Sequence, residues 1–154
     1  GTRIRKKYDL GNAPVVLYVG RISPHKGVHI LVAAFKAAKK EIPKLKLIVA
    51  GKPTFEGYFR KLKDSVKEFE RDVIFTGFVK DEELPEFYAA CNVYASASLW
   101  EGYNLPLAEA QACGKPVVAF DLCSHPEVVK NGVLVKEGDV EGFANGIVRM
   151  LGKV

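Results

Sequence analysis

The feature that most constrains the fold is the regular alternation of short apolar runs with longer amphipathic stretches. Six short runs rich in Val, Ile and Leu predict strands at residues 14–20, 44–51, 72–77, 92–98, 116–120 and 132–136. Several are almost continuously apolar, which is typical of strands that are covered on both faces. Apolar residues recur at helical spacing in the stretches between them, which are 27–40, 55–70, 81–91, 105–113 and 139–151. Because strand and helix alternate along the chain, the sequence predicts an α/β fold with a doubly wound parallel sheet of about six strands.

The 154 residues suffice for one domain with a hydrophobic core of its own. Residues 1–13 are basic and end just before the first apolar run, so we expect a linker or entry segment there and the domain at residues 14–154. No apolar run reaches the roughly 18 residues of a membrane-spanning helix, and the first residues lack the apolar region of a signal peptide. Cytoplasm is therefore the expected location, with association at the membrane surface left open.

The formal net charge is +5 at pH 7. Such an excess fits a partner that carries phosphate, whether a nucleotide, a nucleic acid or an anionic lipid, but it also fits a solvated lysine surface. A nucleic-acid-binding domain is disfavoured, because no basic stripe interleaved with aromatic residues is present. The three cysteines lack the spacing of a zinc site or a disulfide framework, so we expect small buried fillers at Cys91, Cys113 and Cys123.

In a doubly wound sheet, ligands bind beyond the carboxyl ends of the strands. The loop after the first strand reads "GRISPHKG" (20–27), which matches neither a dinucleotide fingerprint nor a P-loop. It nevertheless places Arg21 and Lys26 on one strand-to-helix loop. Gly20 allows close backbone approach, and the helix that starts at Gly27 favours an anion at its first N–H groups. We predict a phosphate clamp here; the alternative is a pair of ordinary surface cations.

The loop after the fourth strand reads "SLWEGYNLPLAEAQACGKP" (98–116) and contains two carboxylates in an apolar neighbourhood. Glu101 lies on the loop, and Glu109 lies about one turn into the following helix. A carboxylate is costly to bury unless donors satisfy it, and the hydroxyls of a ligand can supply them. Gly102 and Asn104 tolerate positive φ, which would expose consecutive backbone N–H groups to an anion.

Three stretches of the chain resemble one enzyme family. "ASLWEGYNLPLAEAQACGKPVVAFD" (97–121) resembles the E-x7-E signature of retaining GT-B glycosyltransferases, which use nucleotide-diphospho-sugar donors. "LYVGRISPHKGVHILVAAF" (17–35) resembles the first phosphate loop of that family, and "FTGFVKDEELPEFYAACNVYASAS" (75–98) resembles its segment around the base pocket. The resemblance runs from Pro14 onward and implies a Rossmann-like domain, the C-terminal, donor-binding half of a GT-B fold.

The resemblance also implies roles for individual residues. Arg21 and Lys26 would hold the donor diphosphate, Glu101 would contact hydroxyls of the donor sugar, and Glu109 would accept hydrogen bonds from the ribose. Backbone groups would bind phosphate near Asn104 and Leu105 and border the base near Phe78 and Val79. The implied set is Arg21, Lys26 and Glu101 as catalytic residues, with Gly20, Phe78, Val79, Gly102, Tyr103, Asn104, Leu105 and Glu109 for donor binding. No D-x-D motif lies at a strand end, and the resemblance implies transfer without a metal or other cofactor.

The implied function is transfer of a hexose, of mannose or glucose type, with retention of configuration. The donor would be a GDP- or UDP-linked sugar and the acceptor a glycan or a lipid-linked molecule, in polysaccharide biosynthesis in the cytoplasm or at the inner face of the membrane. The acceptor-side N-terminal domain is missing, so we expect this chain alone to be inactive. The alternative is a non-catalytic nucleotide-sugar binding module or a GT-B-like epimerase.

The chain departs from the family pattern at a few positions. Cys123 and Ser124 stand where the family usually carries two glycines, which puts the geometry of that loop in doubt. Asn104 replaces a common glycine, but asparagine tolerates the left-handed region, so we expect little disturbance there. His125 could reach the site, although a lone loop histidine is more often a surface residue.

Overall fold

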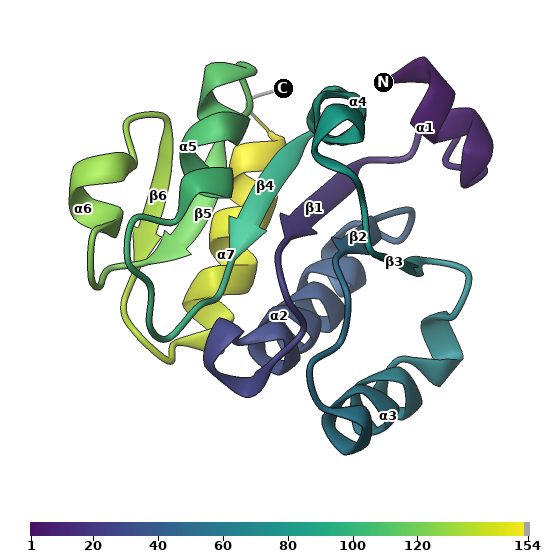
Figure 1. Ribbon diagram of the computed structural model, residues 1–154, viewed down its shortest axis with the longest axis horizontal. Helices are drawn as coiled ribbons and strands as arrows, with labels where there is room; N and C mark the ends of the chain where they lie inside the picture. The colour runs from purple at the N-terminus through teal and green to yellow at the C-terminus, as the bar shows by residue number, and fades with distance from the viewer. Residues whose placement is uncertain (153–154) are drawn as a thin grey trace.

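The computed structural model describes residues 1–152 and confirms the predicted fold class. One parallel sheet of six strands has the order β3-β2-β1-β4-β5-β6, with helices on both faces (Figure 1). The strands are β1 (Val15–Val19), β2 (Lys46–Ala50), β3 (Val73–Gly77), β4 (Val93–Ser96), β5 (Val117–Phe120) and β6 (Gly132–Val135). The α-helices are α1 (Thr2–Lys7), α2 (Val28–Glu41), α3 (Glu56–Ser65), α4 (Leu84–Ala90), α5 (Leu105–Ala112), α6 (His125–Val128) and α7 (Val140–Leu151). Short 3-10 turns occupy Pro24–Lys26 (η1), Lys67–Phe69 (η2) and Asp81–Glu83 (η3).

Two hydrophobic clusters cover the two faces of the sheet. Alternate residues of each strand point to opposite faces, so Val16 and Tyr18 join one cluster while Val15 and Leu17 join the other. The first cluster packs under α2, α3 and α7, and the second under α1, α4, α5 and α6. Figure 1 shows α2 and α7 side by side across one face. Both faces are thus buried, which is why the strands read as continuous apolar runs.

The expectation of a linker at residues 1–13 is not what the structure shows. Residues 2–7 form α1, whose Ile4 is buried in the second cluster, and Leu10 is buried after it. The guanidinium of Arg5 donates to the carbonyl oxygens of Gly11 and Ala13, both at 2.9 Å, and to Oδ1 of Asn92 at 3.1 Å. This segment therefore belongs to the packed domain, although its sequence is too short and too basic to show a helical pattern.

Other boundaries also differ from the prediction. The helix expected over 55–70 ends at Ser65 and continues as the separate turn η2, and α6 was not expected at all. Cys91 is buried as predicted, and burial raises the pKa of its thiol to about 12. The expectation of buried fillers is wrong for Cys113 and Cys123, which are exposed. Among residues 1–152, no helix is long and apolar enough to cross a bilayer.

The strand order reverses direction between β1 and β4, and this switch point prepares the site. The two strands pair only at Val16–Val93 and Leu17–Tyr94 and then separate. Beyond that point the hydroxyl of Tyr94 satisfies the backbone of Val19 in place of a neighbouring strand. It accepts from the N–H of Val19 at 3.2 Å and donates to the carbonyl oxygen of Val19 at 3.1 Å. The chain leaves β1 toward one face and β4 toward the other, and such a point is where ligands bind in open α/β sheets.

Candidate functional site

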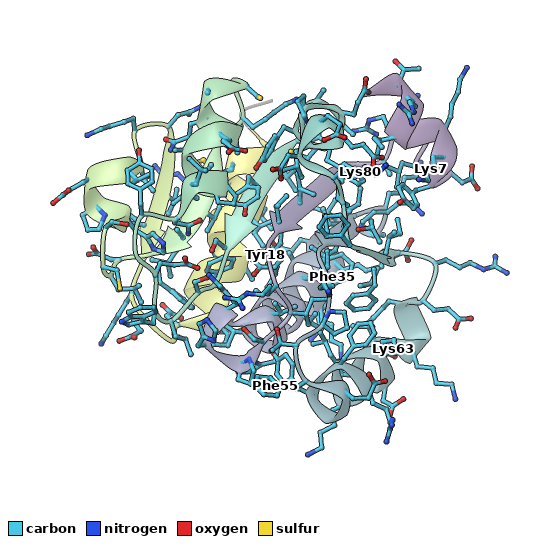
Figure 2. The ribbon with its side chains drawn as sticks, in the orientation of Figure 1. Lys7, Tyr18, Phe35, Phe55, Lys63 and Lys80 are labelled. Carbon is cyan, nitrogen blue, oxygen red and sulfur yellow. The ribbon has the colours of Figure 1, made fainter. Side chains whose placement is uncertain are left out.

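The predicted site residues come together at the carboxyl ends of β1, β3 and β4. In Figure 2, Tyr18 marks the centre of this edge of the sheet, and Phe55 lies farther out near the start of α3. Gly20, Arg21 and Lys26 follow β1, and residues 101–105 follow β4. Five large hydrophobic side chains are exposed in the segments after β2, β3 and β4, which are Phe55, Phe78, Trp100, Tyr103 and Leu105. The site is thus open along this edge.

The loop after β1 is held against the end of β4 by a close backbone approach. Gly27 has φ 65, in the left-handed region, and caps the start of α2. A Cβ at this position would overlap the carbonyl oxygen of Ala97, so the approach requires glycine. The backbone N–H of Leu99 also donates to the carbonyl oxygen of His25 at 2.9 Å. These contacts bring the loop that carries Lys26 to the loop that carries Glu101.

Lys26 and Glu101, predicted separately from two motifs, form an ion pair. Nζ of Lys26 lies 2.8 Å from Oε2 of Glu101, and the side chains are 19% and 10% exposed. The hydroxyl of Ser98 donates to the same carboxylate oxygen at 2.7 Å. The Arg21 residue is exposed, and the hydroxyl of Tyr18 donates to its backbone carbonyl at 2.9 Å. Lys26 and Glu101 therefore meet at the switch point, and Arg21 lies on the same loop as Lys26.

Tyr18 lies beneath this charge cluster. Burial raises the pKa of its phenol well above the ordinary value, and the negative charge of nearby Glu101 adds to the effect. Arg21 opposes it, because a cation favours the phenolate. Tyr18 is therefore a neutral hydrogen-bond donor that fixes the backbone at Arg21, and it takes no part as a base at neutral pH.

The turn between Glu101 and α5 presents backbone donors. Asn104 has φ 41 and ψ 66, the left-handed conformation that its sequence allowed, while Gly102 does not adopt positive φ. Pro106 occupies the first turn of α5. The first N–H groups of a helix have no partner within it, and those of Asn104 and Leu105 donate to no other group among residues 1–152. This turn can therefore bind an anion.

Glu109 lies one turn into α5 and is held by a tyrosine. The hydroxyl of Tyr88 on α4 donates to Oε2 of Glu109 at 3.0 Å. Burial is the main cause that raises the pKa of Tyr88, and the charge and hydrogen bond of Glu109 raise it further. Tyr88 is thus a permanent donor at neutral pH, and it leaves the second oxygen of Glu109 available to a ligand.

A cavity of about 270 Å³ lies beside this cluster and unites further predicted residues. Gly20 and Arg21 line it together with Phe78 and Val79. Lys52, which sequence reasoning missed, also lines it. Phe78 is 72% exposed, so its ring is available to stack on a planar ligand. The cavity therefore joins the cationic loop to the segment predicted to border a base.

Comparison with known proteins settles the family. A family model described as glycosyl transferases group 1 matches residues 2–153. The chain belongs to the group 1 glycosyltransferases. It is 33% identical over 152 residues to O-antigen chain mannosyltransferase B of Escherichia coli, a match that covers 96% of this chain and 39% of that protein. It is 35% identical over 161 residues to the GDP-mannose-dependent alpha-(1-6)-phosphatidylinositol monomannoside mannosyltransferase of Mycolicibacterium smegmatis, covering 97% and 41%.

Solved structures of glycosyltransferases share the fold of this chain. HepE of Anabaena, solved in complex with UDP and glucose, superposes with a TM-score of 0.84 at 32% identity, covering 96% of this chain and 41% of that one. HepE in complex with UDP alone superposes with a TM-score of 0.87, covering 99% and 43%. This group 1 glycosyltransferase chain thus spans about two fifths of the relatives that it matches, as one half of a GT-B-like fold. The predicted family and fold class are confirmed.

Sequence reasoning missed several residues that shape the site of this group 1 glycosyltransferase. Ser98 and Tyr88 hold the two glutamates, and neither carries a motif of its own. His125 was expected at the surface, but it is fully buried and contacts Asn104. A signal existed for His125, because it directly follows the positions where the family glycines are replaced. No cluster of metal-ligating residues is present in the described part of the chain.

Proposed function

We propose that this chain is the donor-binding half of a retaining hexosyltransferase. The observation that carries the proposal is the convergence, at one switch point, of Arg21, the Lys26–Glu101 pair and the Asn104–Leu105 turn. Cations and free N–H groups suit a diphosphate, and a carboxylate beside them suits sugar hydroxyls. A pocket for an uncharged ligand would not need this combination of cations and a carboxylate.

The proposed chemistry places the leaving group among the cations. Each positive charge about 4 Å from a phosphate gains roughly 4 kcal/mol gross at an effective dielectric near 20. Arg21 and Lys26 would thereby stabilise the diphosphate as its bond to the sugar C1 breaks, a role that needs no metal ion. A new bond from C1 to the acceptor oxygen would form on the same face, and the acceptor proton would pass to a phosphate oxygen of the leaving group.

The remaining residues would select and orient the donor. Glu101 would accept hydrogen bonds from the sugar, and Glu109 from the ribose, while Phe78 and Val79 would border the base. The mannosyltransferase relative from Mycolicibacterium smegmatis is named as GDP-mannose-dependent, and the HepE structures contain UDP. We therefore propose a GDP- or UDP-linked hexose of mannose or glucose type as the donor, with mannose preferred.

We propose that the acceptor side lies outside the two fifths of its relatives' length that this chain spans. We propose that an N-terminal domain supplies the acceptor site and that the acceptor is a glycan or a lipid-linked molecule, which would bring the full enzyme to the inner face of the membrane. This chain alone would bind the donor without transferring the sugar. A non-catalytic binding module or an epimerase is the competing function, and it shares the same donor site.

Three measurements test this proposal. A thermal-shift panel of UDP, GDP and ADP against the chain should show stabilisation by one of the first two. The full enzyme should transfer the sugar of the matching donor with retained configuration, while the 154-residue chain should not. Turnover by the isolated chain, or a full enzyme that binds the donor but converts it into its epimer, would contradict the proposal. A gel shift at physiological salt excludes nucleic acid if no complex forms.

A further inference from the structure

The loop after β5 has no role in the proposed chemistry, yet it is fastened to the site at two points. The hydroxyl of Ser124 donates to the carbonyl oxygen of Gly102 at 2.6 Å. His125 is fully buried at the start of α6, and its Nε2 lies 2.9 Å from Nδ2 of Asn104. Cys123 has φ 50, which is uncommon outside glycine. Cys123 thus adopts a conformation that favours glycine, and the next two residues, Ser124 and His125, form hydrogen bonds to the loop after β4.

The hydrogen bonds of His125 have a defined direction. Its Nδ1 lies 2.8 Å from the carbonyl oxygen of Phe120, which can only accept, so Nδ1 carries the hydrogen. In the neutral ring Nε2 is then an acceptor, and it receives an amide hydrogen of Asn104. The second amide hydrogen of Asn104 points to Oγ of Ser96 at 3.2 Å. Both donors of the buried Asn104 amide are therefore used.

These contacts fix the turn that presents the phosphate-facing backbone. Asn104 is the residue in the left-handed conformation, directly before the free N–H group of Leu105. A glycine here would permit that conformation together with many others. An asparagine whose side chain is tied to His125 and Ser96 is held in it, so the donors are oriented before the ligand arrives.

The same chain of hydrogen bonds continues to the ion pair. Ser96 donates to Ser98 at 3.2 Å, and Ser98 donates to Oε2 of Glu101 at 2.7 Å. Because the Asn104 amide already donates to Ser96, the hydroxyl hydrogen of Ser96 is directed away from it, toward Ser98. The buried network therefore runs without a break from His125 to the carboxylate that faces Lys26.

We propose that His125 is a positioning residue of the donor site. By accepting from Asn104, it locks the left-handed turn whose N–H groups meet the diphosphate, and it sets the direction of the hydrogen bonds that reach Glu101. This inference rests on the proposed function, because the turn matters only if a phosphate binds there. His125 itself touches no ligand.

The test is calorimetric titration of two His125 variants with UDP, GDP, uridine and guanosine. His125→Leu fills the space but accepts nothing, so it should weaken binding of the preferred diphosphate about five- to tenfold, as expected for one lost hydrogen bond. Binding of the corresponding nucleoside should change less than about twofold, since the base and ribose contacts lie elsewhere. His125→Gln can still accept from Asn104 and should recover most of the loss.

An Asn104→Gly background supplies the matched control. Asn104→Gly alone should weaken binding of the diphosphate. It allows the left-handed conformation but lacks the side-chain amide that bonds to His125 and Ser96. Adding His125→Leu to it should then have no further effect, since the acceptor has lost its donor. If His125→Leu fails to fold, the Gln variant and Asn104→Gly still decide the question, because diphosphate binding should follow the order parent, His125→Gln, Asn104→Gly.

Three outcomes would overturn the inference. These are equal weakening of nucleoside and diphosphate, additive effects of the two substitutions, and parental diphosphate affinity in either His125→Leu or Asn104→Gly. A parent chain that binds neither UDP nor GDP would instead overturn the proposed function, and the inference with it.

Discussion

The ion pair between Lys26 and Glu101 predicts that removing a site carboxylate strengthens binding of the free nucleoside diphosphate. Without ligand, Nζ of Lys26 is 2.8 Å from Oε2 of Glu101. An arriving diphosphate must draw Lys26 away from this partner or share it, and it also meets the negative charge of Glu101. Glu101→Gln keeps the shape of the side chain and removes both obstacles. The variant should therefore bind UDP or GDP more tightly than the parent.

The magnitude follows from the geometry of the pair. Two unit charges at this distance attract by about 6 kcal/mol gross at an effective dielectric near 20, but lost hydration cancels most of it. The exposures of 19% and 10% place the pair between fully exposed and fully buried. Exposed pairs contribute about 0–1 kcal/mol and breaking a buried pair costs about 3–5 kcal/mol, so a net value of about 1–2 kcal/mol is expected here. This corresponds to roughly 5- to 30-fold tighter binding.

The assay is calorimetric titration of parent and Glu101→Gln with UDP and GDP at low and high salt. The advantage of the variant should shrink as ionic strength rises, because it is electrostatic. In a Lys26→Met background, Glu101→Gln should gain less than it does alone, since the competition for Lys26 is gone. Glu109→Gln is the matched control, because Glu109 binds Tyr88 and not Lys26, and it should weaken diphosphate binding. Unchanged or weaker binding by Glu101→Gln would refute the reasoning.

Three further predictions concern the close backbone approach at Gly27, the ionisation of buried Tyr94, and the effect of chelation on diphosphate binding. Gly27→Ala should lower the thermal unfolding midpoint more than Gly114→Ala, because both have positive φ but only at Gly27 would a Cβ overlap a backbone carbonyl; equal midpoints would contradict this. Burial raises the pKa of Tyr94, so the folded chain keeps a proton that the unfolded chain loses above about pH 10. The free energy of unfolding in urea should fall as pH rises from 10 to 11, less steeply in Tyr94→Phe, and a flat profile would count against it. Chelation with EDTA should leave diphosphate binding unchanged; a loss restored by Mg²⁺ would refute metal-independent binding.

The fold could be predicted because its signal is repeated. Each of the six apolar runs contains an observed strand, and each of the five predicted helical stretches overlaps an observed helix. The short helices α1 and α6 were not predicted, because each covers too few residues to show a helical period of apolar side chains. Such helices form through tertiary packing, here of Ile4 and Val128 against the sheet.

The candidate site residues were named from the sequence one by one, but the contacts that join them were not predicted. The motifs named Lys26 and Glu101 separately, because a sequence does not show that Gly27 packs on Ala97 and brings their loops together. The burial of His125 was missed for a related reason, since its partner Asn104 is 21 residues away in the sequence. Contacts between loops of different strands depend on the three-dimensional fold, and no local pattern encodes them.

The central claim is that Arg21 and Lys26 hold a diphosphate. Its most direct test is the difference in binding free energy between a nucleoside diphosphate and the corresponding nucleoside. Calorimetry should compare UDP with uridine and GDP with guanosine in parent, Arg21→Ala and Lys26→Ala. The control is Lys130→Ala, because Lys130 is an exposed lysine just before the start of β6, away from the carboxyl ends of the strands. Each site variant should lose about 1.5–3 kcal/mol of diphosphate binding, as expected for a hydrogen bond to a charged group, while nucleoside binding stays at the parental level. Parental diphosphate affinity in both site variants, or an equal loss in Lys130→Ala, would contradict the account.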